Sequence, residues 1–322
     1  MTGTTPLEID EARARWRALA DGDPALGPIA AFHDDRLASL RGRPGFDLTV
    51  ELDPSTAVAA IAAGNPLLAL AVLGCDPAEL RTELQLLAGN LSETSPAGSP
   101  AQESASRLVN APVDLGPVLQ AALDGDRAAV EAAAFAANVD PAAFGQLVEL
   151  ALQPVLWEAA ARFAATVGPE AMDTWYRGFC PVCGSWPTLA ELVGSERRRV
   201  LRCGRCGTGW SWIVLLCPYC GNDDHRTLGT LHEAADDALL PRSEPVAAAG
   251  ARVDTCERCH GYLKAITAFS SHPAVRLAAE DVATLHLDVA ATEAGYRRPG
   301  AVDVATAGIP RLVREARPSP DS

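Results

Sequence analysis

The chain has 322 residues, of which 48% are hydrophobic, so it is long enough and apolar enough for a globular protein with a real core. Its formal net charge of −14 counts against a protein whose main task is to grip the phosphate backbone of nucleic acids. Residues 1–20 hold no apolar segment typical of a secretory signal, which predicts a cytoplasmic protein with reduced thiols.

Helix-start signals recur along the first half of the chain. Residues 5–8 (TPLE) form a capping box with Pro at the first helical position. The same Asp-cap-then-Pro signal appears at Asp53-Pro54, Asp76-Pro77 and Asp140-Pro141. Glycines stand where these helices are expected to end, at Gly64, Gly89 and Gly168. Residues 91–100 (LSETSPAGSP) predict a loop or linker.

One uncharged run, Thr56–Cys75, is long enough to suggest a membrane span. It is rich in alanine, and Gly64-Asn65-Pro66 interrupts it. We therefore interpret it as two short buried helices and expect no membrane span.

The second half predicts short strands. TLAELV (188–193) and RRVLRC (198–203) flank the turn residues Gly194-Ser195 and predict a hairpin. WSWIVLLC (210–217), ARVDTC (251–256) and YLKAITAF (262–269) each predict a strand, and residues 278–296 predict a helix from the spacing of Val282, Leu285 and Val289. The expected fold class is α+β: a helical domain over 1–176, then small cysteine modules over 177–214 and 215–310, the second with a C-terminal helix.

Eight of the nine cysteines form four Cys-x-x-Cys pairs between residues 180 and 259. They are Cys180 and Cys183, Cys203 and Cys206, Cys217 and Cys220, and Cys256 and Cys259. A two-residue spacer lets one tight turn aim both sulfurs at one ion, and a following Gly, present after three of the pairs, tolerates a positive φ. Two turns supply the four thiolates of a tetrahedral Zn²⁺ or iron site. We predict two rubredoxin-like or zinc-ribbon-like sites, with neighbouring pairs together and an interleaved pairing as the alternative.

The segment CERCHGYLK (256–264) also matches the attachment motif of c-type haem, with His260 after the second cysteine. Haem attachment requires export, and it would leave other cysteine pairs without partners. A thioredoxin-like motif would open a helix in a βαβ unit, and the sequence predicts no such unit here. We therefore interpret Cys256 and Cys259 as metal ligands and His260 as a surface or neighbouring residue.

The cysteine segments resemble the formate dehydrogenase accessory protein FdhE family. The resemblance rests on FCPVCGSWP (179–187), LRCGRCGTGW (201–210), LCPYCGN (216–222), CERCHGYLK (256–264) and DVATLHLD (281–288). Lys264, the only lysine of the chain, falls within this pattern. The resemblance implies iron in the two sites, no catalysis, and a cytoplasmic protein that binds the catalytic subunit of a molybdenum- or tungsten-dependent formate dehydrogenase and is needed for its activity. Val214 and His260 depart from the family, which usually has Arg and Gly there.

Three functions remain open at this point. The favoured one is a non-catalytic maturation factor that docks formate dehydrogenase, including a client that still carries a twin-arginine leader. A zinc-ribbon nucleic-acid binder is supported only by the basic run Glu196–Arg202, and a redox-active iron protein acting on its client is the third. The sequence contains no nucleophile–base pair, phosphate loop or carboxylate dyad at informative spacing, so we predict no catalytic residues.

Overall fold

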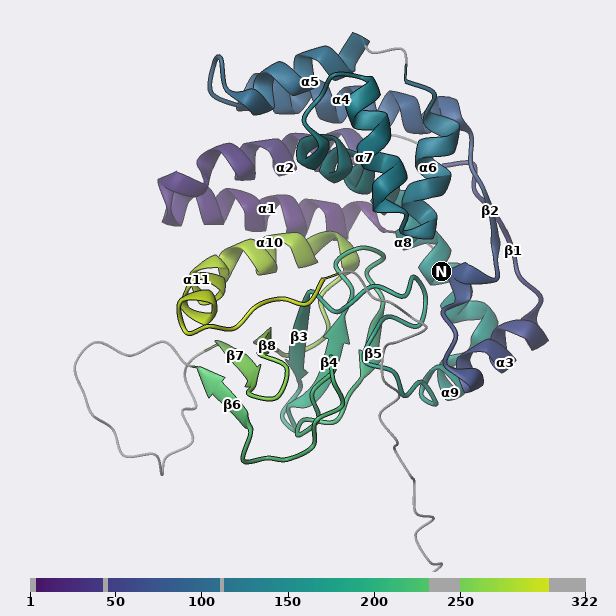
Figure 1. The fold of residues 1–322 in the computed structure, drawn as a ribbon, viewed down its shortest axis with the longest axis vertical. Helices are drawn as coiled ribbons and strands as arrows, with labels where there is room; N and C mark the ends of the chain where they lie inside the picture. Colours follow the sequence, from purple (N-terminus) through teal and green to yellow (C-terminus); the bar gives the residue numbers. More distant parts are fainter. Residues whose placement is uncertain (1–3, 43–45, 111–112, 232–249, 301–322) are drawn as a thin grey trace, which may run out of the picture.

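The computed structural model describes residues 4–42, 46–110, 113–231 and 250–300. The N-terminal half is helical (Figure 1). Its helices are α1 (Pro6–Gly22), α2 (Gly27–Arg41), α3 (Pro54–Ala63), α4 (Pro77–Thr94), α5 (Pro100–Asn110), α6 (Leu115–Asp124), α7 (Arg127–Ala136), α8 (Pro141–Val167) and α9 (Pro169–Met172). A short antiparallel pair, β1 (Thr49–Glu51) and β2 (Val72–Gly74), was not predicted from the sequence.

The predicted helix starts are confirmed. Thr5 and Glu8 form the capping box of α1, and an Asp side chain caps the Pro-started helices α3, α4 and α8. Gly64 and Gly168 end α3 and α8 with positive φ. The predicted helix end at Gly89 is wrong: this residue has no positive φ, and α4 continues to Thr94.

The uncharged run Thr56–Cys75 contains one helix rather than two. After α3, the chain forms a single 3₁₀ turn, Leu67–Ala69, and then enters β2. The turn is fixed from outside, because the backbone N–H groups of Leu67 and Leu68 bond to the carbonyls of Pro181 and Val182. Among the described residues, no helix is both long and apolar enough to cross a membrane.

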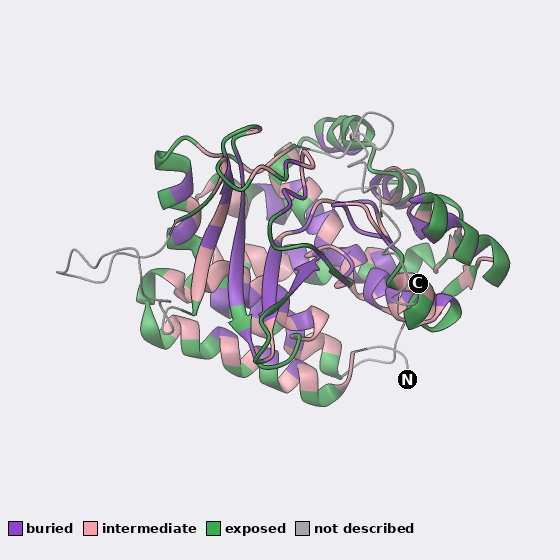
Figure 2. Ribbon diagram, turned by 90° about the horizontal axis from the view of Figure 1, so that it is seen from below, coloured by how far each residue is buried: buried purple, intermediate pink, exposed green. Residues whose placement is uncertain are grey.

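A six-stranded sheet joins the two cysteine modules. Its strands are β3 (Leu189–Val193), β4 (Arg198–Arg202), β5 (Gly209–Ser211), β6 (Leu228–Leu231), β7 (Ala251–Cys256) and β8 (Gly261–Ala268), in the order β5-β4-β3-β8-β7-β6. Neighbouring strands are antiparallel except β3 and β8, which pair in parallel where the two modules meet. Consecutive buried residues in β3, β4 and β8 indicate that both faces of the central sheet are covered (Figure 2).

The hairpin across Gly194-Ser195 and the strands at 251–256 and 262–269 are confirmed. The predicted strand over 210–217 is mostly wrong, because β5 ends at Ser211. Beyond it, the carbonyls of Ile213, Val214 and Leu216 turn inward and accept hydrogen bonds from the buried Arg199 guanidinium at 3.1–3.4 Å. This side chain replaces a neighbouring strand as the hydrogen-bond partner.

The C-terminal segment forms two helices, α10 (Leu277–Ala283) and α11 (Leu285–Glu293). The predicted spacing marks the wrong face of α11, because Leu285 and Val289 are exposed while Leu287 and Ala291 are buried. The helices divide at Thr284, where Lys264 Nζ binds the carbonyls of Asp281 and Thr284.

The helical half packs against the sheet along two contacts. Residues of α8 share one hydrophobic core with the sheet, and this core includes the buried Trp175, Trp210 and Trp212. A second, smaller core joins α1 and α10, with Trp16 packed near Val275. Figure 1 shows α10 and α11 between α1 and the sheet.

Candidate metal centres

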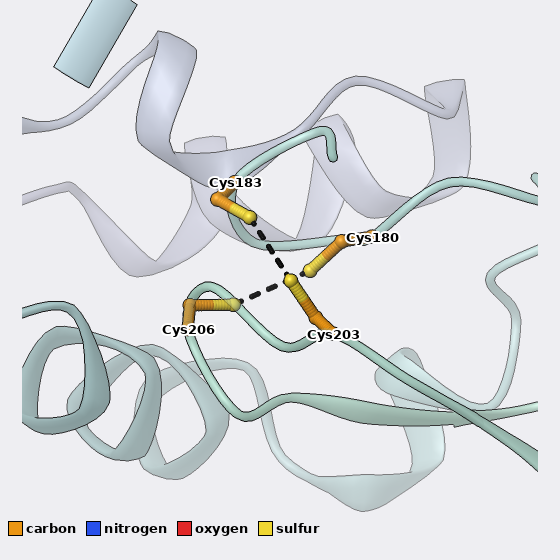
Figure 3. A group of neighbouring side chains, drawn as sticks. All are labelled: Cys180, Cys183, Cys203 and Cys206. Carbon is orange, nitrogen blue, oxygen red and sulfur yellow. Dashed lines mark hydrogen bonds between the residues drawn. The ribbon is translucent and has the colours of Figure 1, made fainter. Parts of the chain in front are cut away.

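The eight predicted cysteines converge in two groups of four. Cys180, Cys183, Cys203 and Cys206 form centre 1 (Figure 3), and Cys217, Cys220, Cys256 and Cys259 form centre 2. Within each group, all four sulfurs lie within 4.8 Å of one another. The pairs therefore group with their sequence neighbours, as favoured above, and the interleaved arrangement is not what the structure has.

The sulfur separations fit a tetrahedral metal site. The Sγ–Sγ distances are 3.4 Å for Cys180–Cys206 and Cys183–Cys203 in centre 1. In centre 2 they are 3.8 Å for Cys217–Cys259 and 3.7 Å for Cys220–Cys256. A tetrahedron with metal–sulfur bonds of ~2.3 Å has edges of ~3.8 Å, whereas a disulfide bond is ~2.05 Å long. The donor set suits Zn²⁺ or a single iron and does not distinguish them.

Three of the four Cys-x-x-Cys turns, called knuckles here, are closed by a hydrogen bond within their own backbone. The N–H of the residue after the second cysteine bonds to the carbonyl of the first cysteine at Gly184, Gly207 and Gly221. All three glycines have positive φ, between 66° and 76°. The fourth turn has the same backbone shape with His260 at φ 52°. This explains why glycine suits the position and places His260 on the surface, where its ring lies near Tyr296.

Two polar residues that the sequence analysis missed contact the sulfurs. Thr208 Oγ1 lies 3.1 Å from Cys206 Sγ, and Asn222 Nδ2 donates to Cys256 Sγ at 3.5 Å. Both occupy the second position after a knuckle's last cysteine, behind Gly207 and Gly221. These two residues could have been predicted from the sequence, because each carries a hydroxyl or amide two residues after a cysteine pair. Hydrogen-bond donors at that position disperse the charge of metal-bound sulfur.

Centre 1 is fixed to the helical half from both of its knuckles. The first knuckle bonds to residues 67 and 68 through its backbone, as described above. In the second, Arg205 donates to Glu149 Oε2 at 2.8 Å, and the Gly204 carbonyl accepts from Gln153 Nε2 at 3.1 Å. Because Glu149 and Gln153 belong to α8, loss of the knuckle geometry would also loosen the contact between sheet and helices.

Arg205 also places a positive charge beside centre 1. Burial acts to lower the pKa of Arg205, but Glu149 and the sulfurs of Cys183 and Cys203 more than reverse this and raise it above its ordinary value. The same arginine helps to lower the pKa of Cys183, although the hydrogen bonds from the other three cysteines contribute more. A tetrathiolate site carries two net negative charges with a divalent ion, so this guanidinium stabilises it.

Centre 2 lies closer to solvent. Cys220 and Cys259 are only partly buried, and the first knuckle of centre 2 packs through Tyr219 against Trp186, with ring centroids 5.3 Å apart. Beside it, Ile213, Val214 and Leu215 form an exposed apolar loop. A hollow of about 80 Å³ separates this loop from the strands, with Val214, Leu215, Cys217 and Cys256 in its lining.

Two segments that carry the family resemblance meet around Lys264. Its Nζ lies 2.8 Å from Asp281 Oδ1 and 2.6 Å from Asp288 Oδ2, and the side chain is fully buried. Arg298 lies 2.8 Å from both carboxylates. Burial acts to raise the pKa of Asp288, but its contacts with Lys264 and Arg298 more than reverse this and lower it. The cluster holds α10 and α11 on β8.

Comparison with known proteins agrees with this arrangement. An FdhE homolog from Edwardsiella ictaluri is 30% identical over 294 residues, which cover 88% of this chain and 83% of that protein. The chain belongs to the FdhE family. The family model described as "FdhE, C-terminal domain" matches residues 217–304.

Two further comparisons show where the likeness lies. FdhE homologs from Shewanella baltica strains are 34% identical over 122 residues, so the match spans only about a third of their length (36%) and 37% of this chain. The crystal structure of the FdhE protein from Pseudomonas aeruginosa covers 92% of this chain and 94% of its own, with a TM-score of 0.59 and 24% identity. This last likeness concerns the fold, which is the mixed helical and sheet arrangement expected from the sequence.

Proposed function

We propose that this FdhE-family protein is a non-catalytic accessory factor that binds the catalytic subunit of a formate dehydrogenase and is needed for that enzyme's activity. In this proposal, the eight cysteines hold two metal ions, iron or zinc. The proposed units are the helical domain 1–176 and the modules 177–214 and 215–310, and the protein acts in the cytoplasm. The observation that carries the proposal is the pair of tetracysteine clusters in a family member.

The contrast between the two centres supports a division of roles. Three of the four cysteines of centre 1 are buried, and its knuckles are bonded to the helical half, so its metal would serve the internal architecture. Centre 2 lies beside the exposed loop 213–215, and exposed apolar side chains next to a rigid metal site favour contact with another protein. We infer that the client touches the molecule on the centre 2 side.

The test is affinity purification of the full chain from its native host. We expect a formate dehydrogenase catalytic subunit among the recovered proteins. The variant Val214→Asp should reduce its recovery, while Leu7→Asp, at an even more exposed apolar position on α1, should not. Recovery of only ribosomal or nucleic-acid proteins would contradict the proposal. Equal affinity for client with and without its leader would argue against recognition of a twin-arginine leader.

The nucleic-acid alternative finds little support in the basic run at Glu196–Arg202. Alternate residues of a strand face opposite sides. Arg199 is buried and paired with Asp254 at 3.0 Å, and Arg202 is buried and paired with Glu191 at 2.7 Å. Only Arg197 and Arg198 are exposed, which is too few for a backbone-binding stripe.

A redox role for iron is a second candidate because two of the four cysteines of centre 2, Cys220 and Cys259, are only partly buried. Access of solvent and partners to a thiolate-bound iron favours electron exchange. A potential titration of iron-loaded protein tests it. A reversible change of the thiolate-to-iron absorbance supports this role, and a spectrum that does not change with potential excludes it.

A further inference from the structure

An open hollow of about 350 Å³ lies beside strands β4 and β5 and shares no lining residue with the hollow next to centre 2. Arg198 and Arg202 contribute to it from the same face of β4, because they are four residues apart on a strand. Gly209 and Ser211 of β5 pair in register with Arg202 and Val200 and also line the hollow. None of these residues has a role in the two metal centres as ligand.

Arg202 forms one wall and retains an unused donor. It is only 4% exposed. Its two terminal nitrogens bind Glu191 Oε2 at 2.7 Å and the Gly207 carbonyl at 3.0 Å, but its buried Nε has no partner among the described residues. A buried donor without an acceptor is destabilising, because its hydrogen bond to water is lost and not replaced. A Cβ on Gly209 would lie 3.3 Å from this Nε, so a side chain there would shield the donor.

Trp210 lies between Gly209 and Ser211, but its side chain faces the opposite side of β5 and is buried in the hydrophobic core with Leu201. Arg198 is exposed and forms no ion pair with any described residue. The hydroxyl-bearing Ser211 and Ser271 complete a lining rich in hydrogen-bond donors.

The acidic groups nearby leave the Nε of Arg202 and the guanidinium of Arg198 unbound, although Glu191 binds a terminal nitrogen of Arg202. Glu191 is fully buried and bonded to Arg202 and to both the backbone N and Nδ1 of His272, at 3.0 and 2.8 Å. Burial acts to raise its pKa, but His272 and Arg202 more than reverse this and lower it, so the carboxylate stays charged and engaged. Asp173 is the carboxylate in the lining itself, and it is exposed.

We propose that this hollow is an anion-binding site that takes a carboxylate or phosphate group. Arg198 recognises the group, because its planar guanidinium can form paired hydrogen bonds to either oxyanion. Arg202 contributes the one donor it has unused, Nε, since its terminal nitrogens already bind Glu191 and the Gly207 carbonyl. Occupation would reach centre 1 through one contact, since Arg202 also holds the carbonyl of Gly207, the residue after Cys206. The basic run on β4 thus serves a small anionic group rather than a nucleic-acid backbone.

Calorimetric titration of the zinc-loaded full chain at low ionic strength tests the site, with inorganic phosphate and succinate as separate probes. We expect saturable binding of at least one probe, and the one that binds identifies the group. Arg198→Gln should weaken it about tenfold, since the change removes one charge-assisted hydrogen bond at an exposed position. The matched control Arg197→Gln removes the same charge from a neighbouring exposed position outside the hollow, and it should change affinity less than about twofold.

Two results would overturn the proposal. One is the absence of saturable binding for both probes. The other is an equal loss of affinity in Arg197→Gln and Arg198→Gln, which would mean that the anions respond only to the general charge of the hairpin. Both substitutions are at exposed side chains, so the variants keep the fold and the comparison remains interpretable.

Discussion

Replacement of Lys264 by Met should destabilise the protein strongly, although the change removes only one charge. The ammonium is 0% exposed and lies within 2.8 Å of two carboxylates and within 2.6 Å of the Asp281 carbonyl. Removal of one partner from a buried ion pair costs about 3–5 kcal/mol. Arg298 stays beside both carboxylates, so we place Lys264→Met at the lower end, about 3 kcal/mol.

Thermal unfolding of the metal-loaded protein measures this effect. At about 2 °C per kcal/mol for a chain of this size, the midpoint should fall by roughly 6 °C. The deficit should shrink on acidification, because the uncompensated carboxylate of Asp288 can then take up a proton. Adding Asp288→Asn to the Lys264→Met chain should recover part of the loss for the same reason.

An exposed ion pair provides the control. Arg226 is 79% exposed and contacts Asp224 at 3.1 Å, so Arg226→Gln should change stability by no more than about 1 kcal/mol. If Lys264→Met melts within a degree of this control, the buried cluster does not hold α10 and α11 on the sheet, and the reasoning fails.

The remaining predictions concern the knuckles and a buried histidine. Elemental analysis should show that Cys206→Ser and Cys259→Ser each reduce the bound metal from two ions to one. Cys206→Ser should lower the melting midpoint more, because centre 1 is bonded to α8. Equal shifts of the midpoint would contradict this. Gly207→Ala should lower the free energy of unfolding, measured in urea, by about 1–3 kcal/mol. The residue has φ 76°, and the new Cβ would lie 2.2 Å from the Cβ of Ala274. His260→Gly should leave this free energy unchanged or raise it, because glycine tolerates the positive φ of that position. Burial lowers the pKa of His33 to about 3. Below pH ~6.5 the unfolded state therefore binds a proton that the folded state does not bind. The free energy of unfolding should consequently fall by about 2 kcal/mol between pH 6.5 and 5. His33→Phe should remove this part of the pH dependence, and an unchanged slope would show that the histidine is not its source.

The candidate site was predictable because its signals are local. A Cys-x-x-Cys turn specifies its own geometry, and the glycine after it reports the positive φ that the turn requires, as Gly184 and Gly221 confirm. The same applies to the helix caps, where Asp53 or Asp140 satisfies donors within three residues of itself.

The errors arise where distant residues decide local structure. The run 210–217 has the composition of a strand, but its carbonyls accept hydrogen bonds from Arg199 and not from a neighbouring strand. This contact could not be predicted from residues 210–217, because Arg199 belongs to a different strand. Lys264 similarly divides the C-terminal helices from 20 residues away at Thr284. Gly89 fails for a related reason, because a glycine ends a helix only where packing allows the chain to turn away.

The parallel pairing of β3 with β8 affects how this protein can be divided. Strands 189–193 and 261–268 are central in the joined sheet, yet each would become an open edge if its module stood alone. Open edges of buried, apolar strands template association with other chains. Unlike free-standing zinc ribbons, these modules should not fold as separate proteins. We expect each half of a chain divided between residues 214 and 215 to be insoluble when it is expressed alone. We also expect the two modules to occur together in evolution and not singly in other proteins.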